Sequence, residues 1–239
     1  MVFRFAEGGG FVPMGFFATE APQFTLYGDG TVIFRDGDIA PPPPSNPNLI
    51  VLAPFQTARL DAADVQSFLR FALADSGLGV ARAAYTPGNV ADAPTATFTI
   101  NAGGLSKTVS VEALGFDNPQ SPDAPILAAM AKLGDVVRDF GSSVEDETTW
   151  MPERWRGVLT PDALNPPTAW PWPDIAPTDF VQRPEPGAPQ FPVRTMTPAE
   201  IDVLGLDGIE GGFSGLSLTG PDGRIYFFAL RPLLPDETY

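Results

Sequence analysis

The chain has 239 residues and a formal net charge of −15, from 29 acidic and 14 basic side chains. It contains no histidine and no cysteine, which excludes imidazole-based or thiolate-based catalytic triads and dyads, cysteine-bound metal clusters and disulfides within the chain. Its acidity disfavours nucleic acid as a partner, and no apolar run reaches the roughly 20 residues of a membrane span.

The first part of the chain is expected to form short strands joined by tight turns. Val2–Ala6 has the pattern of a strand, and Gln23–Tyr27 and Thr31–Arg35 flank a Gly-Asp-Gly turn, which predicts a hairpin. Pro41–Pro47 cannot donate ladder hydrogen bonds and is expected to be an exposed polyproline-type loop. Leu49–Leu52 is predicted to be a short buried strand.

Two helices with a hairpin between them are predicted in the middle of the chain. The first helix begins at Asp61, because Asp61 and Asp64 occupy the N-cap and N3 positions. Thr95–Ile100 and Leu105–Val111 predict the hairpin. The second helix begins near Pro122-Asp123, and its apolar stripe predicts a buried face. The stripe consists of Ile126, Met130, Leu133, Val137 and Phe140.

A helix followed by a hairpin is also predicted near the end of the chain. Thr197-Pro198-Ala199-Glu200 is a capping box that begins a short helix ending by Gly205. The hairpin follows in Leu216–Leu218 and Arg224–Leu230. A capped helix and a hairpin also occur between Leu60 and Val111, but capping alone produces the matching positions, so we favour that explanation over an internal duplication.

These elements predict an α+β fold of antiparallel β-hairpins packed by two or three helices, with an irregular connector rich in Trp and Pro. The predicted domains are an N-terminal α+β unit (1–144), the connector (145–192) and a C-terminal helix–hairpin unit (193–239). One compact domain containing all three parts is the alternative.

The tryptophans are the best functional lead. All four lie in the segment from residue 150 to residue 172, namely Trp150, Trp155, Trp170 and Trp172. Indole rings offer rigid faces on which sugars, cations or proline-rich peptides stack, so these four residues are the candidate ligand-binding residues. The structural alternative, in which the indoles tie the connector to a sheet, is the more frequent use of buried aromatic residues.

The carboxylates suggest two further hypotheses. A carboxylate pair could hydrolyse glycosidic bonds without histidine or cysteine, but the sequence does not show which two acids face each other, so no catalytic residue is assigned. Acids such as Asp36 with Asp38, Glu145–Glu147, or Asp236 with Glu237 could instead hold calcium. No EF-hand loop is present, so no metal ligand is assigned, and calcium is the one cofactor considered.

Three segments resemble a group of uncharacterised exported, often lipoprotein-type, proteins of actinobacteria and chloroflexi. They are the hairpin Pro22–Ile33, the Trp-Pro-Trp-Pro-Asp stretch Trp170–Asp174, and the closing stretch Leu230–Glu237. The resemblance implies an extracellular or cell-envelope location and a lipid-anchored precursor, and it brings no known activity. The first residues run directly into a strand pattern without a signal peptide, so a cytoplasmic location stays open.

The sequence therefore predicts a non-catalytic envelope or secreted protein that binds or scaffolds a protein, peptide or glycan. A carboxylate-dependent carbohydrate-active enzyme and a calcium-stabilised structural protein are the alternatives.

Overall fold

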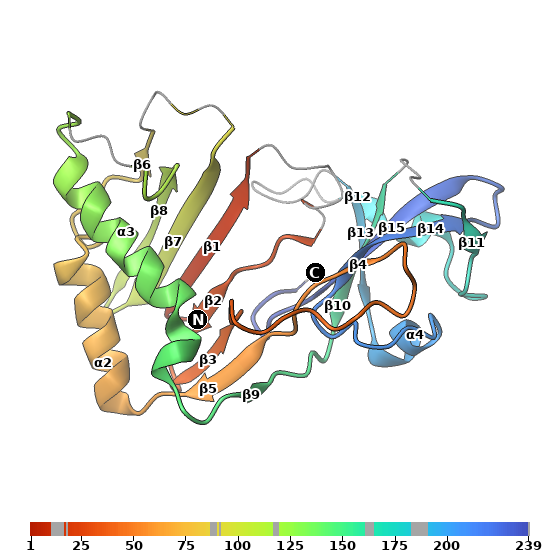
Figure 1. The fold of residues 1–239 in the computed structure, drawn as a ribbon, viewed down its shortest axis with the longest axis horizontal. Helices are drawn as coiled ribbons and strands as arrows, with labels where there is room; N and C mark the ends of the chain where they lie inside the picture. The colour runs from red at the N-terminus through yellow and green to blue at the C-terminus, as the bar shows by residue number, and fades with distance from the viewer. Residues whose placement is uncertain are drawn as a thin grey trace. The chain divides into compact units, whose positions relative to one another are not determined.

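The computed structural model describes residues 1–10, 17, 19–86, 90, 92–116, 120–160, 165–182 and 191–238. These residues form a sheet-rich α+β fold with two β-sheets and few helices, which confirms the predicted fold class at this level (Figure 1). The chain divides into two compact units. The first unit is Met1–Val12, Pro22–Ile39 and Phe55–Trp150, and the second unit is Pro13–Ala21, Ala40–Pro54 and Met151–Tyr239. The predicted division into residues 1–144, 145–192 and 193–239, with one compact domain as its alternative, stays a prediction.

The first unit contains an eight-stranded sheet in the order β6-β8-β7-β1-β2-β3-β5-β9. The strands are β1 (Phe3–Gly9), β2 (Phe24–Leu26), β3 (Thr31–Phe34), β5 (Gln56–Arg59), β6 (Ala84–Tyr85), β7 (Pro94–Ala102), β8 (Leu105–Glu112) and β9 (Thr148–Thr149). All neighbouring pairs are antiparallel except β6 with β8. Both predicted hairpins of this unit, β2–β3 and β7–β8, are confirmed.

Helices α2 (Ala62–Arg70) and α3 (Ala124–Arg138) pack against this sheet (Figure 1). Helix α2 continues into a π-helical turn, η1 (Phe71–Asp75), and α3 is followed by a 3₁₀ turn, η2 (Phe140–Ser143). The predicted N-cap of α2 is confirmed, because Asp61 Oδ1 accepts a hydrogen bond of 2.8 Å from Asp64 N. In the predicted stripe of α3, Met130, Leu133 and Val137 are buried in the core.

Phenylalanines from the strands and helices form the centre of this core. Phe24 packs edge-to-face on Phe3 and Phe140, and its ring stacks on Phe68 of α2. Edge-to-face aromatic pairs contribute beyond the area they bury, by about 0.5–1.5 kcal/mol each. The alternating apolar residues of β1 and β7 therefore face one aromatic core shared with the helices.

The second unit contains a seven-stranded sheet in the order β11-β14-β15-β10-β13-β12, with β4 also paired to β14. The strands are β4 (Ile50–Val51), β10 (Trp155–Thr160), β11 (Thr168–Ala169), β12 (Val181–Gln182), β13 (Pro192–Met196), β14 (Phe213–Thr219) and β15 (Ile225–Pro232). The other elements are the 3₁₀ turn η3 (Pro177–Asp179) and helix α4 (Pro198–Asp202). The predicted hairpin β14–β15 and the predicted short strand β4 are both present.

The segment expected to be an irregular connector contains a central strand. Strand β10 pairs with β13 on one side and with β15 on the other. Its Gly157 allows close packing, because a Cβ there would lie 2.6 Å from Met196 Sδ and 2.9 Å from a ring carbon of Phe228. The strand was not predicted from the sequence, because prolines and tryptophans flank it and because its pairing partners lie far away in the sequence.

Two hairpin turns, one in each unit, have the same hydrogen bonds. In the first, Gly30 N donates to Tyr27 O, and Thr31 N donates to Asp29 Oδ1. In the second, Gly223 N donates to Gly220 O, and Arg224 N donates to Asp222 Oδ1. Both closing glycines have positive φ, 89° at Gly30 and 77° at Gly223, as a three-residue hairpin loop requires.

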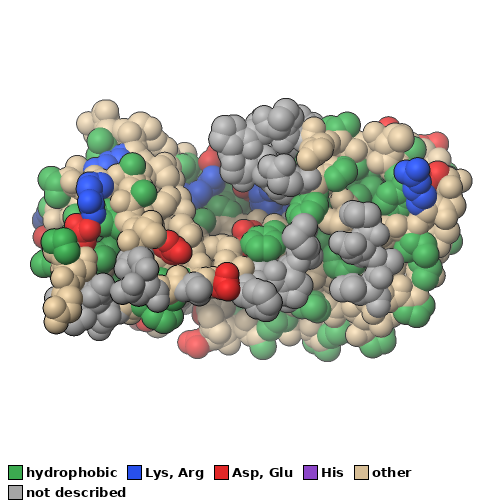
Figure 2. All heavy atoms as spheres, turned by 90° about the horizontal axis from the view of Figure 1, so that it is seen from above, with side chains coloured by type: hydrophobic (Ala, Val, Ile, Leu, Met, Phe, Trp, Pro, Cys, Tyr) green, Lys and Arg blue, Asp and Glu red, His purple; other side chains and the backbone are tan. Residues whose placement is uncertain are grey.

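Among the described residues, no helix combines the length and the apolar character needed to cross a bilayer. On the face seen in Figure 2, acidic side chains are scattered rather than gathered into one patch.

Candidate functional site

The second unit carries a solvent-open pocket of about 430 Å³ beside the segment Trp170–Asp179. Most of the described lining comes from that segment, and the rest comes from the end of β14 and the turn that follows it. The described lining residues are Trp170, Trp172, Pro173, Asp174, Ile175, Ala176, Asp179, Thr219 and Pro221. A volume of this size lies in the usual range for small-molecule sites. The sequence-predicted residues Trp170 and Trp172 therefore meet at one cavity.

The indole N–H groups of both pocket tryptophans are donated to the protein itself. Trp170 Nε1 donates to Ile175 O at 2.6 Å, which folds the segment back on itself. Trp172 Nε1 donates to Glu200 O at 2.7 Å, which ties the segment to α4. Trp172 is 4% exposed, whereas Trp170 is half-buried. The accessible indole surface at the pocket therefore belongs mainly to Trp170, and neither indole offers the pocket an N–H donor.

Both indoles belong to an aromatic cluster that fixes their position. The ring centroids of Trp170 and Trp172 are 5.2 Å apart, in an edge-to-face arrangement. Trp172 also packs on Phe228 of β15 at 5.3 Å, and Trp170 contacts Phe180 and Tyr226, both at 6.2 Å. Each ring is held by two or more others, so the aromatic part of the pocket is pre-formed.

Helix α4 anchors Trp172 and is itself held by its capping box. Thr197 Oγ1 accepts from Glu200 N, and Glu200 Oε2 accepts from Thr197 N at 2.8 Å. Arg194 Nη2 forms an ion pair of 2.9 Å with Glu200 Oε1. Desolvation raises the pKa of Glu200, but the hydrogen bonds from Arg194 and Thr197 outweigh it, so the pKa of this carboxyl is lowered. Glu200 therefore has two roles in α4, because its backbone carbonyl accepts the Trp172 N–H and its carboxylate holds the start of the helix.

Two carboxylates, Asp174 and Asp179, line the pocket, and both side chains are exposed. Asp179 Oδ2 accepts a hydrogen bond of 2.8 Å from Ala176 N and closes the turn η3. Asp174 forms no hydrogen bond or ion pair with the described part of the chain. No lysine or arginine is among the described lining residues.

The turn that supplies Pro221 is fixed next to the pocket. A Cβ at Gly220 would lie 2.7 Å from Asp222 Oδ1, 2.8 Å from a ring carbon of Tyr226 and 3.2 Å from Pro177, so a larger residue would force these side chains to shift. Asp222 accepts from Tyr226 Oη at 2.7 Å, and that hydrogen bond lowers the pKa of Asp222. Both oxygens of the Asp222 carboxylate therefore accept hydrogen bonds within the turn and its flanking strand.

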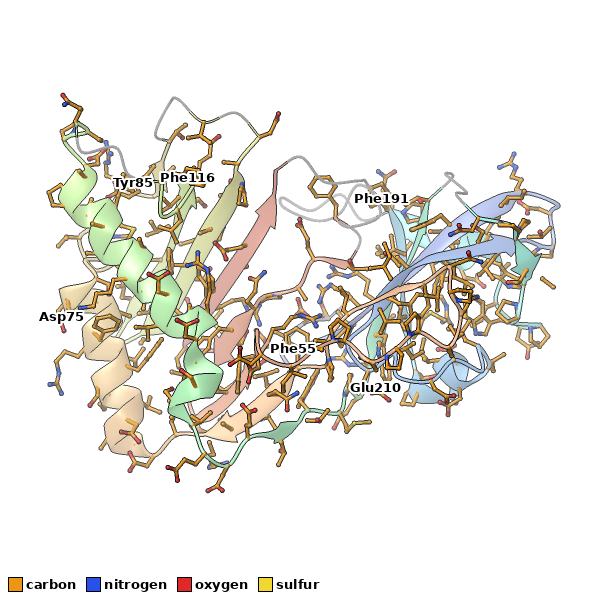
Figure 3. All side chains as sticks on the ribbon, in the orientation of Figure 1. Phe55, Asp75, Tyr85, Phe116, Phe191 and Glu210 are labelled. Atoms are coloured by element: carbon orange, nitrogen blue, oxygen red, sulfur yellow. The ribbon has the colours of Figure 1, made fainter. Side chains whose placement is uncertain are left out.

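The other two predicted tryptophans lie elsewhere. Trp155 is 7% exposed on β10 and belongs to the core of the second unit, and its Nε1 has no hydrogen-bond partner among the described residues. Trp150 lies in the first unit, half-buried, with its ring 6.0 Å from that of Phe55, which Figure 3 labels. Proximity in the sequence thus does not make the four indoles one platform.

The acidic stretches considered for calcium are used in different ways. Glu237 forms two hydrogen bonds with the buried Arg231, of 2.8 and 2.9 Å, so its carboxylate serves an ion pair. Within the described ranges, no group of three or more acidic side chains is placed to hold a metal ion. Calcium stays a prediction that chelation would test.

Asp36 and Glu147, from two of those stretches, come close together in the first unit. Glu147 Oε2 is buried and has no hydrogen-bond partner among the described residues. Burial raises the pKa of Glu147, and the neighbouring Asp36 carboxylate raises it further. Because the folded state holds this proton more tightly than the unfolded chain, the contribution of Glu147 to stability is full below its unfolded pKa and is lost as the pH rises through the raised value.

Glu147→Gln is accordingly expected to raise the melting temperature at neutral pH, and the gain should disappear as the pH falls below about 4, near the ordinary glutamate pKa. Thermal melts across this pH range measure the difference. Glu145→Gln, an exposed neighbour with the same charge change, is the control. A lower melting temperature for Glu147→Gln at neutral pH would mean that the ionised carboxylate is stabilised, as a bound cation would do.

Sequence reasoning found the two tryptophans of the pocket and missed its two acids. The available signal was the placement of Asp174 directly after Trp-Pro-Trp-Pro, where a charge follows two indoles on a stiff backbone. Asp179 carried no such signal, because its position depends on the fold of the segment between Trp170 and Phe180.

No protein-family model matches the chain, and comparison with curated proteins and with solved structures gives no match.

Proposed function

We propose that this is a non-catalytic binding protein that takes a small ligand, or a short part of a larger one, at the pocket of Trp170 and Trp172. The observation that carries the proposal is the pre-formed cavity itself, in which an aromatic wall is combined with two carboxylates. Rigid aromatic rings placed before binding lower the entropy cost of association. An envelope or secreted location, as the resemblance implies, is part of the proposal.

The carbohydrate-enzyme alternative draws its support from Asp174 and Asp179, which line the same cavity. In such enzymes burial keeps one carboxyl protonated so that it can act as the general acid. Both acids of this pocket are exposed to water, which favours binding over hydrolysis. Release of nitrophenol from aryl glycosides, abolished by Asp174→Asn, would overturn this preference. A melting temperature that falls on chelation would favour the calcium-stabilised alternative.

The test uses the four indole N–H signals in a nitrogen–proton NMR spectrum of the labelled protein. We expect at least one member of a panel of organic cations, neutral sugars and proline-rich peptides to shift the signals of Trp170 and Trp172. Trp150 and Trp155 lie outside the pocket lining and are internal references. A panel that moves none of the signals, or moves all four equally, would contradict binding at this pocket.

A further inference from the structure

The hydrogen-bonding capacity of the pocket narrows the class of ligand, given the binding function proposed above. A sugar presents both donors and acceptors and needs both kinds of partner from its site. The described lining side chains provide two carboxylates, which only accept, and one hydroxyl, that of Thr219. The two indole N–H groups are already donated to Ile175 O and Glu200 O. Side-chain donors for a neutral sugar, or for the carbonyls of a proline-rich peptide, are therefore scarce.

The same features suit a positive charge. Aromatic rings attract cations through their electron-rich faces, and the attraction is strongest for indole. Asp174 and Asp179 add negative charge, no described lining residue is basic, and the whole chain carries a net charge of −15. An ammonium nitrogen that carries only alkyl groups has no N–H donor and no lone pair. Its alkyl groups could therefore contact the ring surface of Trp170 without leaving a hydrogen-bonding group of the cation unsatisfied.

We infer that the pocket bounded by Trp170, Trp172, Asp174 and Asp179 binds a compact organic cation, a substituted ammonium group. Ring surface supplies contact area for its alkyl substituents, and the carboxylates supply the charge complement. Specificity against neutral molecules of the same shape then comes from the charge alone.

Choline and its uncharged carbon isostere, 3,3-dimethylbutan-1-ol, form a matched pair of probes for this inference, because they differ only in a quaternary nitrogen against a quaternary carbon. We expect choline to shift the Trp170 and Trp172 indole signals, and the isostere to bind about tenfold more weakly, as the combined effects of cation–π attraction and the nearby carboxylates suggest. The affinity for choline should fall with added salt, because both carboxylates are exposed.

Asp174→Asn is expected to weaken choline binding about threefold, the size of one solvent-exposed charge interaction. Asp207→Asn is the matched control, since Asp207 is an exposed acid of the same unit that does not line the pocket, and it should leave choline binding unchanged. Equal losses in the two variants would mean that choline responds to net charge and would overturn the assignment to this pocket.

The remaining outcomes separate the ligand class from the binding function. Equal affinity for choline and the isostere, or shifts produced by methyl glucoside in place of choline, would overturn the cation and leave a binding pocket. If neither choline nor the neutral probes move the two indole signals, both the inference and the binding function fail.

Discussion

Replacing Gly30 by alanine is expected to lower the free energy of unfolding by about 3 kcal/mol, the combined cost of a left-handed backbone and of overpacking. Gly30 has a φ of 89°, and a Cβ at this position would overlap the carbonyl oxygen of Leu60. The turn cannot move away cheaply, because Leu60 N donates to Gly30 O at 2.9 Å. Chemical denaturation at neutral pH measures the loss.

Gly223→Ala is the control for this prediction. Its turn has the same hydrogen bonds and a φ of 77°, but nothing lies within 4 Å of a Cβ at residue 223. It should cost only the backbone term, about 1 kcal/mol. Equal losses at the two glycines would show that the contact of the new Cβ with Leu60 adds nothing to the cost.

Glu237→Gln is expected to destabilise the protein by about 3 kcal/mol, because it leaves a buried charge without its partner. The Arg231 side chain is 3% exposed and that of Glu237 is 14% exposed. Glu237 Oε2 also accepts from Leu234 N at 2.8 Å, so the carboxylate holds the chain after β15 as well as the guanidinium.

The measurement is again denaturant unfolding. The control is Asp207→Asn, which removes one negative charge from an exposed position in the same unit. That control should stay within about 0.5 kcal/mol of the parent protein, as surface substitutions usually do. A loss for Glu237→Gln no larger than that of the control would mean that water enters and solvates Arg231 in the variant.

The elements that could be predicted from the sequence are those specified by neighbouring residues. The cap at Asp61, the capping box of α4 and the turns at Gly30 and Gly223 depend on side chains within a few positions, so their patterns predicted helices and hairpins at the places where they occur. The apolar stripe of α3 could be predicted for the same reason, because its residues lie three or four positions apart in the sequence.

The features that escaped prediction depend on contacts between distant residues. Strand β10 is specified by β13 and β15, which follow it by tens of residues. Asp174 and Asp179 share a cavity because Trp170 Nε1 reaches Ile175 O, and Asp36 comes near Glu147 across more than a hundred residues. Which of 29 acids would meet could not be read from their spacing.

The strand order of the second unit determines when its pocket can form during translation. Until β15 leaves the ribosome, the strands of this sheet form two separate groups, β10 with β12 and β13, and β14 with β4 and β11. Strand β15 joins them and brings Tyr226 and Phe228 to the two indoles. A nascent chain stalled before residue 225 would therefore have made both pocket tryptophans and Phe180 but would lack Tyr226 and Phe228, the two rings of β15 that pack on the indoles.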